Sequence, residues 1–208
     1  MKTRFSYIIS ALFAVSMMAC SHSETATTQP QDSVAGNQTL EMLKTRRAVR
    51  SYTDSIPSAD VLAKVLEAGT YAPTGMGSQS PIIVAVTNRA MRDSLAHMNA
   101  AVMGRDTDPF YGAPVVLVVL ADKNCPTHVY DGSLVMGNLL NAAHAVGLSS
   151  CWVHRAKEVF NTPQGKALLK EWGIEGDYEG IGNCILGYSP DPAPEPKPRK
   201  PNYIYHVD

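Results

Sequence analysis

The sequence lacks the signatures of several common enzyme classes. No G-x-G-x-x-G loop follows a strand-like run and no Walker-type loop occurs, so neither a Rossmann dinucleotide domain nor a P-loop NTPase is indicated. No nucleophile elbow and no Ser-His-Asp pattern can be found. The four cysteines form no C-x-x-C pair and no cluster at zinc spacing, so we expect neither a metal site nor a disulfide framework.

Charge bias is also small. The 208 residues carry a formal net charge of −1, with 18% charged and 45% hydrophobic residues. This balance indicates no nucleic-acid partner and is ordinary for a globular protein with one substantial core.

The first twenty residues resemble a bacterial lipoprotein signal. Lys2 and Arg4 give a positive start, Tyr7–Val15 is an apolar run, and a cysteine follows Ala19. We expect residues 1–19 to be a signal peptide and Cys20 to be lipidated. The protein would then be exported and anchored to a membrane by lipid alone, on its periplasmic or cell-surface side. The alternative is an ordinary signal peptide with an incidental cysteine.

A tether and one folded domain are expected after the signal. Residues 20–38 are rich in Ser, Thr, Gln and Asn and cannot bury enough surface to fold. From residue 39 to 208, helical and strand patterns alternate, which predicts one α/β or α+β domain with a mixed sheet of four or five strands flanked by helices. The expected helices are 39–47, 58–69, 88–103, 130–147 and 162–173, and the expected strands are 81–87, 114–121, 149–153 and 181–188.

Three of these segments carry more specific predictions. The helix 130–147 is apolar nearly all round, which indicates burial in a core or in a subunit interface. The strands 81–87 and 114–121 are continuous apolar runs, which predicts burial on both faces. Beyond the last strand, the proline-rich arm 190–201 must run extended.

The residues that suggest chemistry are cationic or lie in a small-residue loop. Arg46, Arg47 and Arg50 follow the first helix, and Lys197 and Arg199 lie on the proline-rich arm. Two basic clusters at such distant positions could converge on one phosphate, although each alone is more often a solvated surface. The loop 71–79 is rich in small residues and lets a flat polar ring approach its backbone closely.

Taken together and in this order, these motifs resemble the nitroreductase family. The residues that carry the resemblance are Arg46-Arg47-x-x-Arg50, Ala72-Pro73-Thr74-Gly75 with Gln79, Ala143-x-x-x-Gly147-Leu148-Ser149-Ser150, and Leu186-Gly187-Tyr188 followed by Lys197-Pro198-Arg199. The resemblance covers residues 40–205. It implies an α+β fold and an intertwined homodimer with FMN bound at the dimer interface.

The resemblance also implies roles for residues. Arg46 would reach the FMN phosphate with Lys197 and Arg199, and Arg50 would reach the pyrimidine edge of the flavin. The loop residues Pro73, Thr74 and Gly75 would cover the ring from the partner subunit, and Gly77 of the same loop belongs to the cofactor-binding set. The segment Cys151, Trp152, Val153 and His154 would pass beside the reactive edge and offer backbone groups. Arg47 and Ala48 belong to the same cofactor-binding set, and His154 is a weak candidate for proton donation.

Two departures bear on substrate rather than on flavin. Ala48 replaces the usual serine of the arginine motif, and Gly77 replaces the usual asparagine of the loop.

The function that this resemblance implies is hydride transfer from NAD(P)H, through the flavin, to a small electron-poor acceptor such as a nitroaromatic or a quinone, with ping-pong kinetics. Two alternatives stay open: a flavin-dependent dehalogenase or ene-type reductase on the same scaffold, and a lipoprotein that binds flavin without turnover.

Overall fold

The computed structural model of the chain describes residues 37–208. The expected signal peptide, Cys20 and nearly all of the expected tether lie outside the described residues. The helices are α1 (Gln38–Thr45), α2 (Ala59–Thr70), the 3-10 turn η1 (Gly75–Gly77), α3 (Arg89–Met103), α4 (His128–Ala145), α5 (Ala156–Asn161) and α6 (Pro163–Glu171). The strands are β1 (Pro81–Val86), β2 (Val115–Asp122), β3 (Ser149–Val153) and β4 (Tyr178–Gly187).

The four strands form one sheet in the order β1-β2-β4-β3. The predicted α+β class and a sheet of four strands are confirmed, but the expectation of a mixed sheet is wrong. All three strand pairs are antiparallel. The one parallel pairing in the described part of the chain is an isolated bridge between Ala48 and Ser150. Alternation of helices and strands suggested parallel crossovers, yet it fixes no strand direction, since a helix can also connect antiparallel neighbours.

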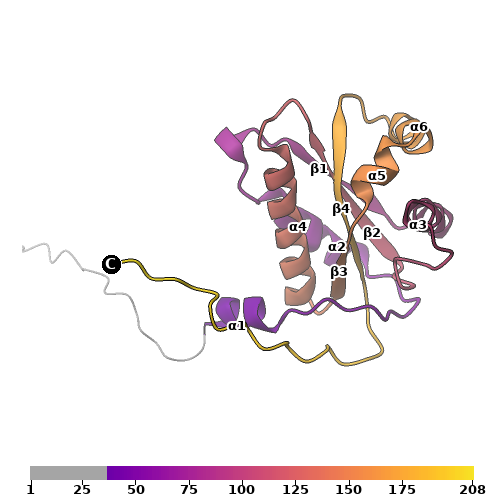
Figure 1. Cartoon of the computed structure of the whole chain (residues 1–208). Helices are drawn as coiled ribbons and strands as arrows, with labels where there is room; N and C mark the ends of the chain where they lie inside the picture. The colour runs from indigo at the N-terminus through magenta and orange to yellow at the C-terminus, as the bar shows by residue number, and fades with distance from the viewer. Residues whose placement is uncertain (1–36) are drawn as a thin grey trace, which may run out of the picture. The chain divides into compact units, whose positions relative to one another are not determined.

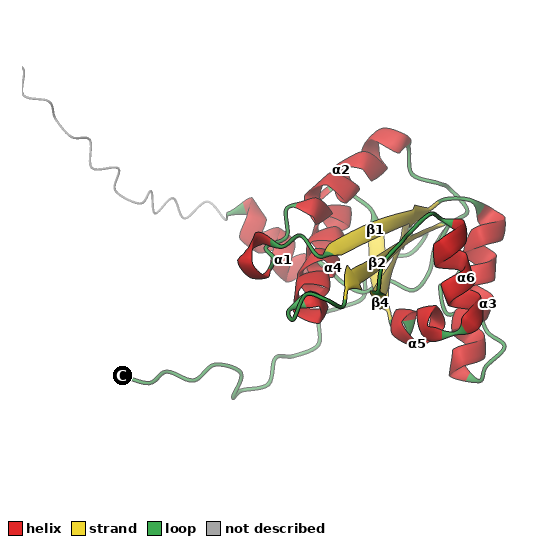
Figure 2. Cartoon of the chain, turned by 90° about the horizontal axis from the view of Figure 1, so that it is seen from above, coloured by secondary structure: helices red, strands yellow, loops and turns green. Residues whose placement is uncertain are grey.

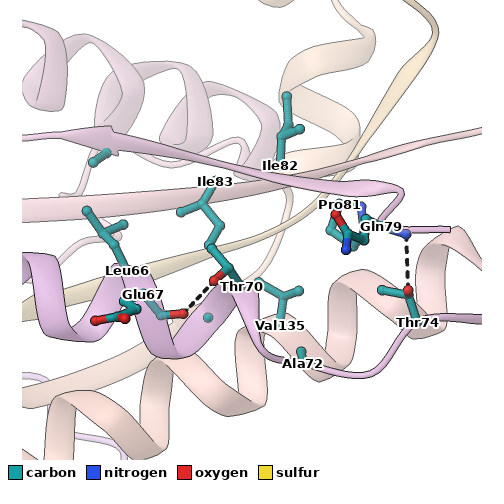
Figure 3. Close-up of a pocket in the computed structure, with 12 residues that line it drawn as sticks. Leu66, Glu67, Thr70, Ala72, Thr74, Gln79, Pro81, Ile82, Ile83 and Val135 are labelled. Carbon is teal, nitrogen blue, oxygen red and sulfur yellow. Dashed lines mark hydrogen bonds between the residues drawn. The ribbon is translucent and has the colours of Figure 1, made fainter. Parts of the chain in front are cut away.

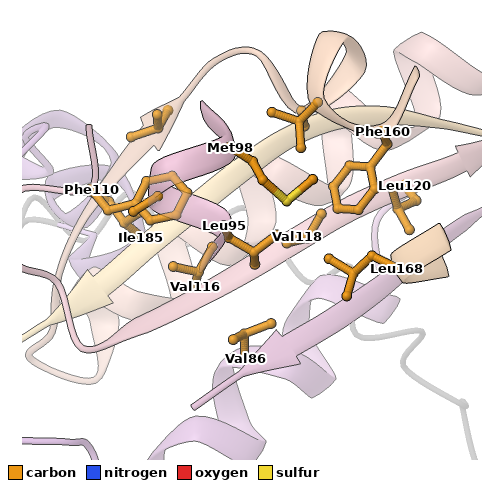
Figure 4. Packing of buried hydrophobic residues seen from close by; sticks show 14 of the residues in the cluster. Val86, Leu95, Met98, Phe110, Val116, Val118, Leu120, Phe160, Leu168 and Ile185 are labelled. Atoms are coloured by element: carbon orange, nitrogen blue, oxygen red, sulfur yellow. The ribbon is translucent and has the colours of Figure 1, made fainter. Parts of the chain in front are cut away.

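Helices cover both faces of the sheet (Figures 1 and 2). One face packs against α3, α5 and α6 through a cluster that includes Leu95, Phe110 and Phe160 (Figure 4). The other packs against α2 and α4 through a cluster that includes Val65 and Leu139. The central strand β2 is buried along nearly its whole length and serves both clusters.

Several helices begin where the sequence places a capping side chain. Ser58 accepts a hydrogen bond from the Val61 amide at the start of α2, and Asn88 does the same for Met91 in α3. Thr162 caps α6, whose first residue is a proline that needs no amide partner there. Local capping therefore sets these boundaries as predicted.

Two elements differ from expectation. β1 is an edge strand whose residues are mostly half-buried, not buried on both faces, because α4 and α2 cover only part of it. Helix α5 was not predicted, because its six residues are too few to show a helical period. The arm after β4 is free of helix and strand from Tyr188 onward, as expected.

Within residues 37–208, no helix is both long enough and apolar enough to cross a membrane.

Candidate functional site

The two basic clusters converge in the structure. A cavity of about 820 Å³ is lined by Arg46 and Arg47 from the end of α1 and by Lys197 and Arg199 from the arm. Figure 1 shows the arm running back past α1. Leu43, Pro196, Pro198, Tyr203 and Ile204 supply apolar walls. None of these four cations takes part in an ion pair with another described residue. The basic cavity therefore has the charge and the partly apolar lining that suit an anion with a partly apolar body.

The electrostatics around the basic cavity agree with this assignment. His144, near the end of α4, shares a hydrogen bond of 3.0 Å with Thr45 Oγ1. Burial lowers the pKa of His144, and the positive charges of Arg46 and Arg47 lower it further. Its ring therefore stays neutral and adds no charge of its own at neutral pH.

Arg47 Nε, in the lining of the basic cavity, is buried and has no hydrogen-bond partner among the described residues. The same holds for Ser150 Oγ, which is at the start of β3 and pairs through its backbone with Ala48. The rest of the Arg47 guanidinium is used locally, because Nη1 donates to the carbonyl oxygens of Lys44 and Arg46 at 2.6 and 2.8 Å. A buried donor without an acceptor costs free energy, so such atoms commonly mark a place where a ligand binds.

The segment that carries the arginines is held beside β3. The Val49 amide donates to the Ser150 carbonyl at 3.1 Å, and Ala48 forms the parallel bridge with Ser150. Arg50 does not line the basic cavity. Its guanidinium lies 5.9 Å from the ring centre of Tyr111, on the other face of the sheet from α4. The role of Arg50 at the flavin pyrimidine thus stays a prediction.

The small-residue loop is fixed by a carboxylate that sequence reasoning missed. Asp131, in the first turn of α4, accepts hydrogen bonds from the Gly75 amide at 2.9 Å and from the hydroxyls of Ser80 and Thr127 at 3.0 Å each. Burial opposes ionisation of Asp131, but these bonds together keep its pKa below the ordinary value. The signal was an acidic residue in an otherwise apolar helix, which we assigned to no role.

Backbone geometry explains the glycines of this loop. A Cβ on Gly75 would lie 2.3 Å from Thr127 Oγ1, so no larger residue fits against α4. Gly77 has a positive φ of 67° and open space around it. The preceding Met76 is almost fully exposed, with φ of 52°. The loop is thus packed against α4 at Gly75 and projects into solvent at Met76 and Gly77. We call residues 73–79 the ledge.

An apolar cavity of about 460 Å³ lies under this ledge, between α2 and the edge strand β1. Figure 3 shows Leu66, Ile83 and Val135 along it, and the Gln79 amide donating to Thr74 Oγ1 at 3.0 Å at its end. Of the predicted site residues, only Thr74 lines this cavity, so it is distinct from the basic one.

The predicted ring-edge segment lies at the far end of β3. Cys151 and Val153 are buried in the core on the side of α3, so only their backbones are free to contact a ligand. Trp152 and His154 point to the other side and line a cavity of about 340 Å³ with Arg155 and Ser133. We call this the β3-end cavity. Arg155 was not among the predicted residues.

The basic cavity and the β3-end cavity lie toward opposite ends of α4. Ser133 lines the β3-end cavity, whereas His144 adjoins the arginines of the basic one. The axial rise between these two residues is about 16 Å. The strand β3, with the unpaired Ser150 hydroxyl at its start, connects the two.

Three comparisons with known proteins show which family the chain resembles. Residues 43–188 match the sequence profile of the nitroreductase family. An Archaeoglobus fulgidus protein, named as an NADH dehydrogenase/NAD(P)H nitroreductase, is 30% identical over 159 residues, which are 73% of this chain and 86% of the relative. A Methanothermobacter thermautotrophicus protein of the same name is 30% identical over 118 residues, and the match spans 54% of this chain and 59% of that relative.

Among solved structures, a Bacteroides fragilis nitroreductase with bound FMN superposes with a TM-score of 0.77 at 27% identity. The superposition covers 83% of this chain and the whole of the other. The profile match, the relatives and the shared fold lead to one conclusion. The chain belongs to the nitroreductase family.

Proposed function

We propose that this protein is an FMN-dependent oxidoreductase that passes a hydride from NAD(P)H to a small electron-poor acceptor. The observation that carries the proposal is the basic cavity. Arg46, Arg47, Lys197 and Arg199 meet there from distant parts of the chain, and a buried guanidinium nitrogen lacks an acceptor. Guanidinium and ammonium groups without carboxylate partners suit the oxygens of a terminal phosphate.

The residues present fit FMN better than a dinucleotide. The basic cavity can hold one terminal phosphate, and no dinucleotide-binding motif occurs in the sequence. The β3-end cavity has walls that combine Trp152 with backbone groups suited to a flat polar ring. The Bacteroides fragilis relative carries FMN, which supports the same assignment.

When bound, the flavin supplies the redox chemistry, accepting and donating a hydride. The protein then has three tasks. Arg46, Arg47, Lys197 and Arg199 neutralise and orient the phosphate, and the Ser150 hydroxyl offers a further hydrogen bond. The backbone after β3 sets the position of the ring edge. In a dimer, the loop that Asp131 fixes would cover the flavin ring bound to the partner subunit and exclude water from it.

The names of two relatives support a choice of donor and acceptor. Both are named for NAD(P)H, and their names include nitroreductase activity. This supports NAD(P)H as the donor and nitroaromatics or quinones as acceptors.

A spectrum tests the proposal. Full-length protein extracted in detergent should show a flavin absorption band, and anaerobic NADH or NADPH should bleach it. An acceptor should then restore the band. Bound flavin that no pyridine nucleotide reduces would contradict the oxidoreductase and favour a flavin-binding lipoprotein. Reduction by a different donor together with release of halide from a halogenated aromatic would favour a dehalogenase.

We further propose that the protein is a homodimer. One face of α4 is uncovered in the single chain, with Tyr130 72% and Leu134 48% exposed. Gly137 lies on the same face with no atom near the position of a Cβ, so another backbone can approach it closely. The apolar arm residues Tyr205 and Val207 are also exposed.

Leu134→Asp tests the dimer. We expect it to shift sedimentation from dimer to monomer and to reduce FMN retention, because a charge would be buried in the interface. Glu67→Asp, on the outside of α2, is a control that should change neither. A Leu134→Asp protein that remains a dimer with full FMN content would show that this face is not the interface.

The lipid anchor is a separate proposal. It rests on the positive start, the apolar run and Cys20 alone. Two acyl chains would suffice for stable attachment to a membrane. Intact-mass analysis of protein extracted from membranes should find a mature chain beginning at Cys20 with acyl groups added. A different first residue, or no acyl mass, would contradict it.

A further inference from the structure

Arg155 has a backbone conformation that residues with a Cβ seldom adopt. It follows β3, precedes α5 and has φ of 77° and ψ of 11°, in the left-handed region. No side chain caps α5 at this end, so capping does not compensate for the conformation. Such backbone persists only where the surroundings hold it in place, and it is often found at functional sites.

A buried asparagine on α3 holds this conformation. The amide nitrogen of Asn99 donates to the carbonyl oxygen of His154 at 2.9 Å. Its amide oxygen accepts a hydrogen bond from Arg155 Nε at 3.0 Å. Asn99 is 1% exposed, and both ends of its amide are used, so it cannot reorient. One side chain thus ties together the backbone of one residue and the guanidinium of the next.

Strand β4 supports the same turn from a second direction. The side-chain amide of Asn183 lies 3.4 Å from the carbonyl oxygen of Val153 and 3.5 Å from that of His154. At Gly180 there is no room for a Cβ, which would lie 2.4 Å from the backbone of Ala156. The start of α5 is therefore pressed directly onto the sheet.

Glycine at position 155 would give the same turn without a clamp, because glycine adopts positive φ freely. Arginine gives the turn and also places a cation on the wall of the β3-end cavity beside His154. The buried Asn99 compensates for the strain of having a side chain at this position. A purely structural turn requires neither the arginine nor the clamp.

We propose that Asn99 is a positioning residue: by holding Arg155 in the left-handed conformation, it sets the backbone of residues 153–155 against the flavin ring. The proposal rests on the proposed FMN function. It assigns Arg155 as the residue through which this backbone is strained; the wall of the cavity also carries Lys157, Glu158 and Glu179.

The matched pair Arg155→Gly and Arg155→Ala separates backbone from charge. Both variants lose the guanidinium, but only alanine retains the cost of positive φ. In full-length protein without flavin, we expect the amides of residues 153–157 to exchange hydrogen faster in Arg155→Ala than in Arg155→Gly. With FMN bound, the rate at which NADH reduces the flavin should be lower in Arg155→Ala than in Arg155→Gly by a factor of about ten or more. Small displacements of a positioning group have effects of this size.

The clamp itself is tested by Asn99→Ala alone and combined with Arg155→Gly. The single variant should speed amide exchange at 153–157 and slow flavin reduction, and the glycine should restore both. Asn138→Ala removes a comparable bond, from a side-chain amide to the Ala68 carbonyl at 3.0 Å, and should leave exchange at 153–157 unchanged. If Asn99→Ala does not fold, the Arg155 pair still decides.

Equal behaviour of the glycine and alanine variants would overturn the proposal, as would failure of Arg155→Gly to rescue Asn99→Ala. A wild-type protein that takes up no FMN would refute the proposed function instead. The exchange rates would still show whether the clamp holds the turn.

Discussion

The bond network of Asp131 allows a quantitative test of the ledge. Asn is nearly the same shape but has one acceptor oxygen and no charge. Asp131→Asn can therefore keep at most part of the three short bonds from Gly75, Ser80 and Thr127. A hydrogen bond to a charged group contributes about 1.5–3 kcal/mol, so we expect a loss of about this size in the free energy of unfolding. Asp131→Ala should cost more, because each buried donor left without a partner adds about 1–3 kcal/mol.

The pH dependence gives this prediction its sign. The pKa of Asp131 is lower in the folded protein than its ordinary value. Its contribution to stability is therefore complete above the unfolded pKa of about 3.9 and is lost as the pH falls through the lower, folded value. Asp131→Asn removes the titrating group. The stability difference between wild type and variant should be constant near neutral pH and shrink in acid.

Urea unfolding followed by circular dichroism, at one protein concentration and several pH values, measures this difference. Asp60→Asn is the matched control, because Asp60 also lies in the first turn of a helix but is exposed. It should lose only about 0.3–1 kcal/mol, from the helix dipole. The reasoning is refuted if the two variants lose the same stability, or if the Asp131→Asn difference does not diminish in acid.

Three further outcomes are expected. Arg199→Ala should weaken FMN binding about ten- to hundredfold in a fluorescence titration, whereas Lys200→Ala, outside the basic cavity, should not. Hydrogen bonds from Ser78 and Thr127 lower the pKa of Cys125. Burial raises the pKa of Cys151, and it raises the pKa of Cys184 to about 12. Of these three cysteines, iodoacetamide at neutral pH should therefore label Cys125 first. Initial rates against NADH at several quinone concentrations should give parallel double-reciprocal lines. Intersecting lines would indicate a second nucleotide site.

The elements could be predicted from the sequence where the signal was local. Side chains at Ser58 and Thr162 mark the helix starts, and β3 has the predicted bounds. β1 could not be assigned as an edge strand, because an apolar run looks the same whether one or both faces are covered. Whether a strand lies at the edge depends on the order of the strands in the sheet. That order is set by contacts between segments that are far apart in the sequence.

The site residues, too, could be predicted only where their signal was local. The basic clusters were predictable because charge and proline are visible in the sequence, and the structure does bring Arg46 and Arg199 together. The roles of Asp131 and Arg155 were not. The Asp131 carboxylate accepts a hydrogen bond from Gly75, 56 residues away in the chain. Arg155 stands out only because its backbone has a positive φ. The acidic residue in α4 was visible in the sequence, but the local pattern shows neither its long-range hydrogen-bond partners nor a positive φ on a non-glycine residue.

Helix α4 shows why an apolar helix can have two functions at once. Its inward face is fully buried in the single chain, and Leu139 has no exposed surface. Its outward face presents Leu134 and Gly137, so the same helix offers a second surface for a partner. A charge at Leu139 would disrupt the core, whereas a charge at Leu134 acts on the outward face alone. Since Ser133 of this helix also lines the β3-end cavity, a partner docked on the outward face of α4 would lie next to that cavity. Dimerisation and flavin binding should therefore be thermodynamically coupled, each strengthening the other.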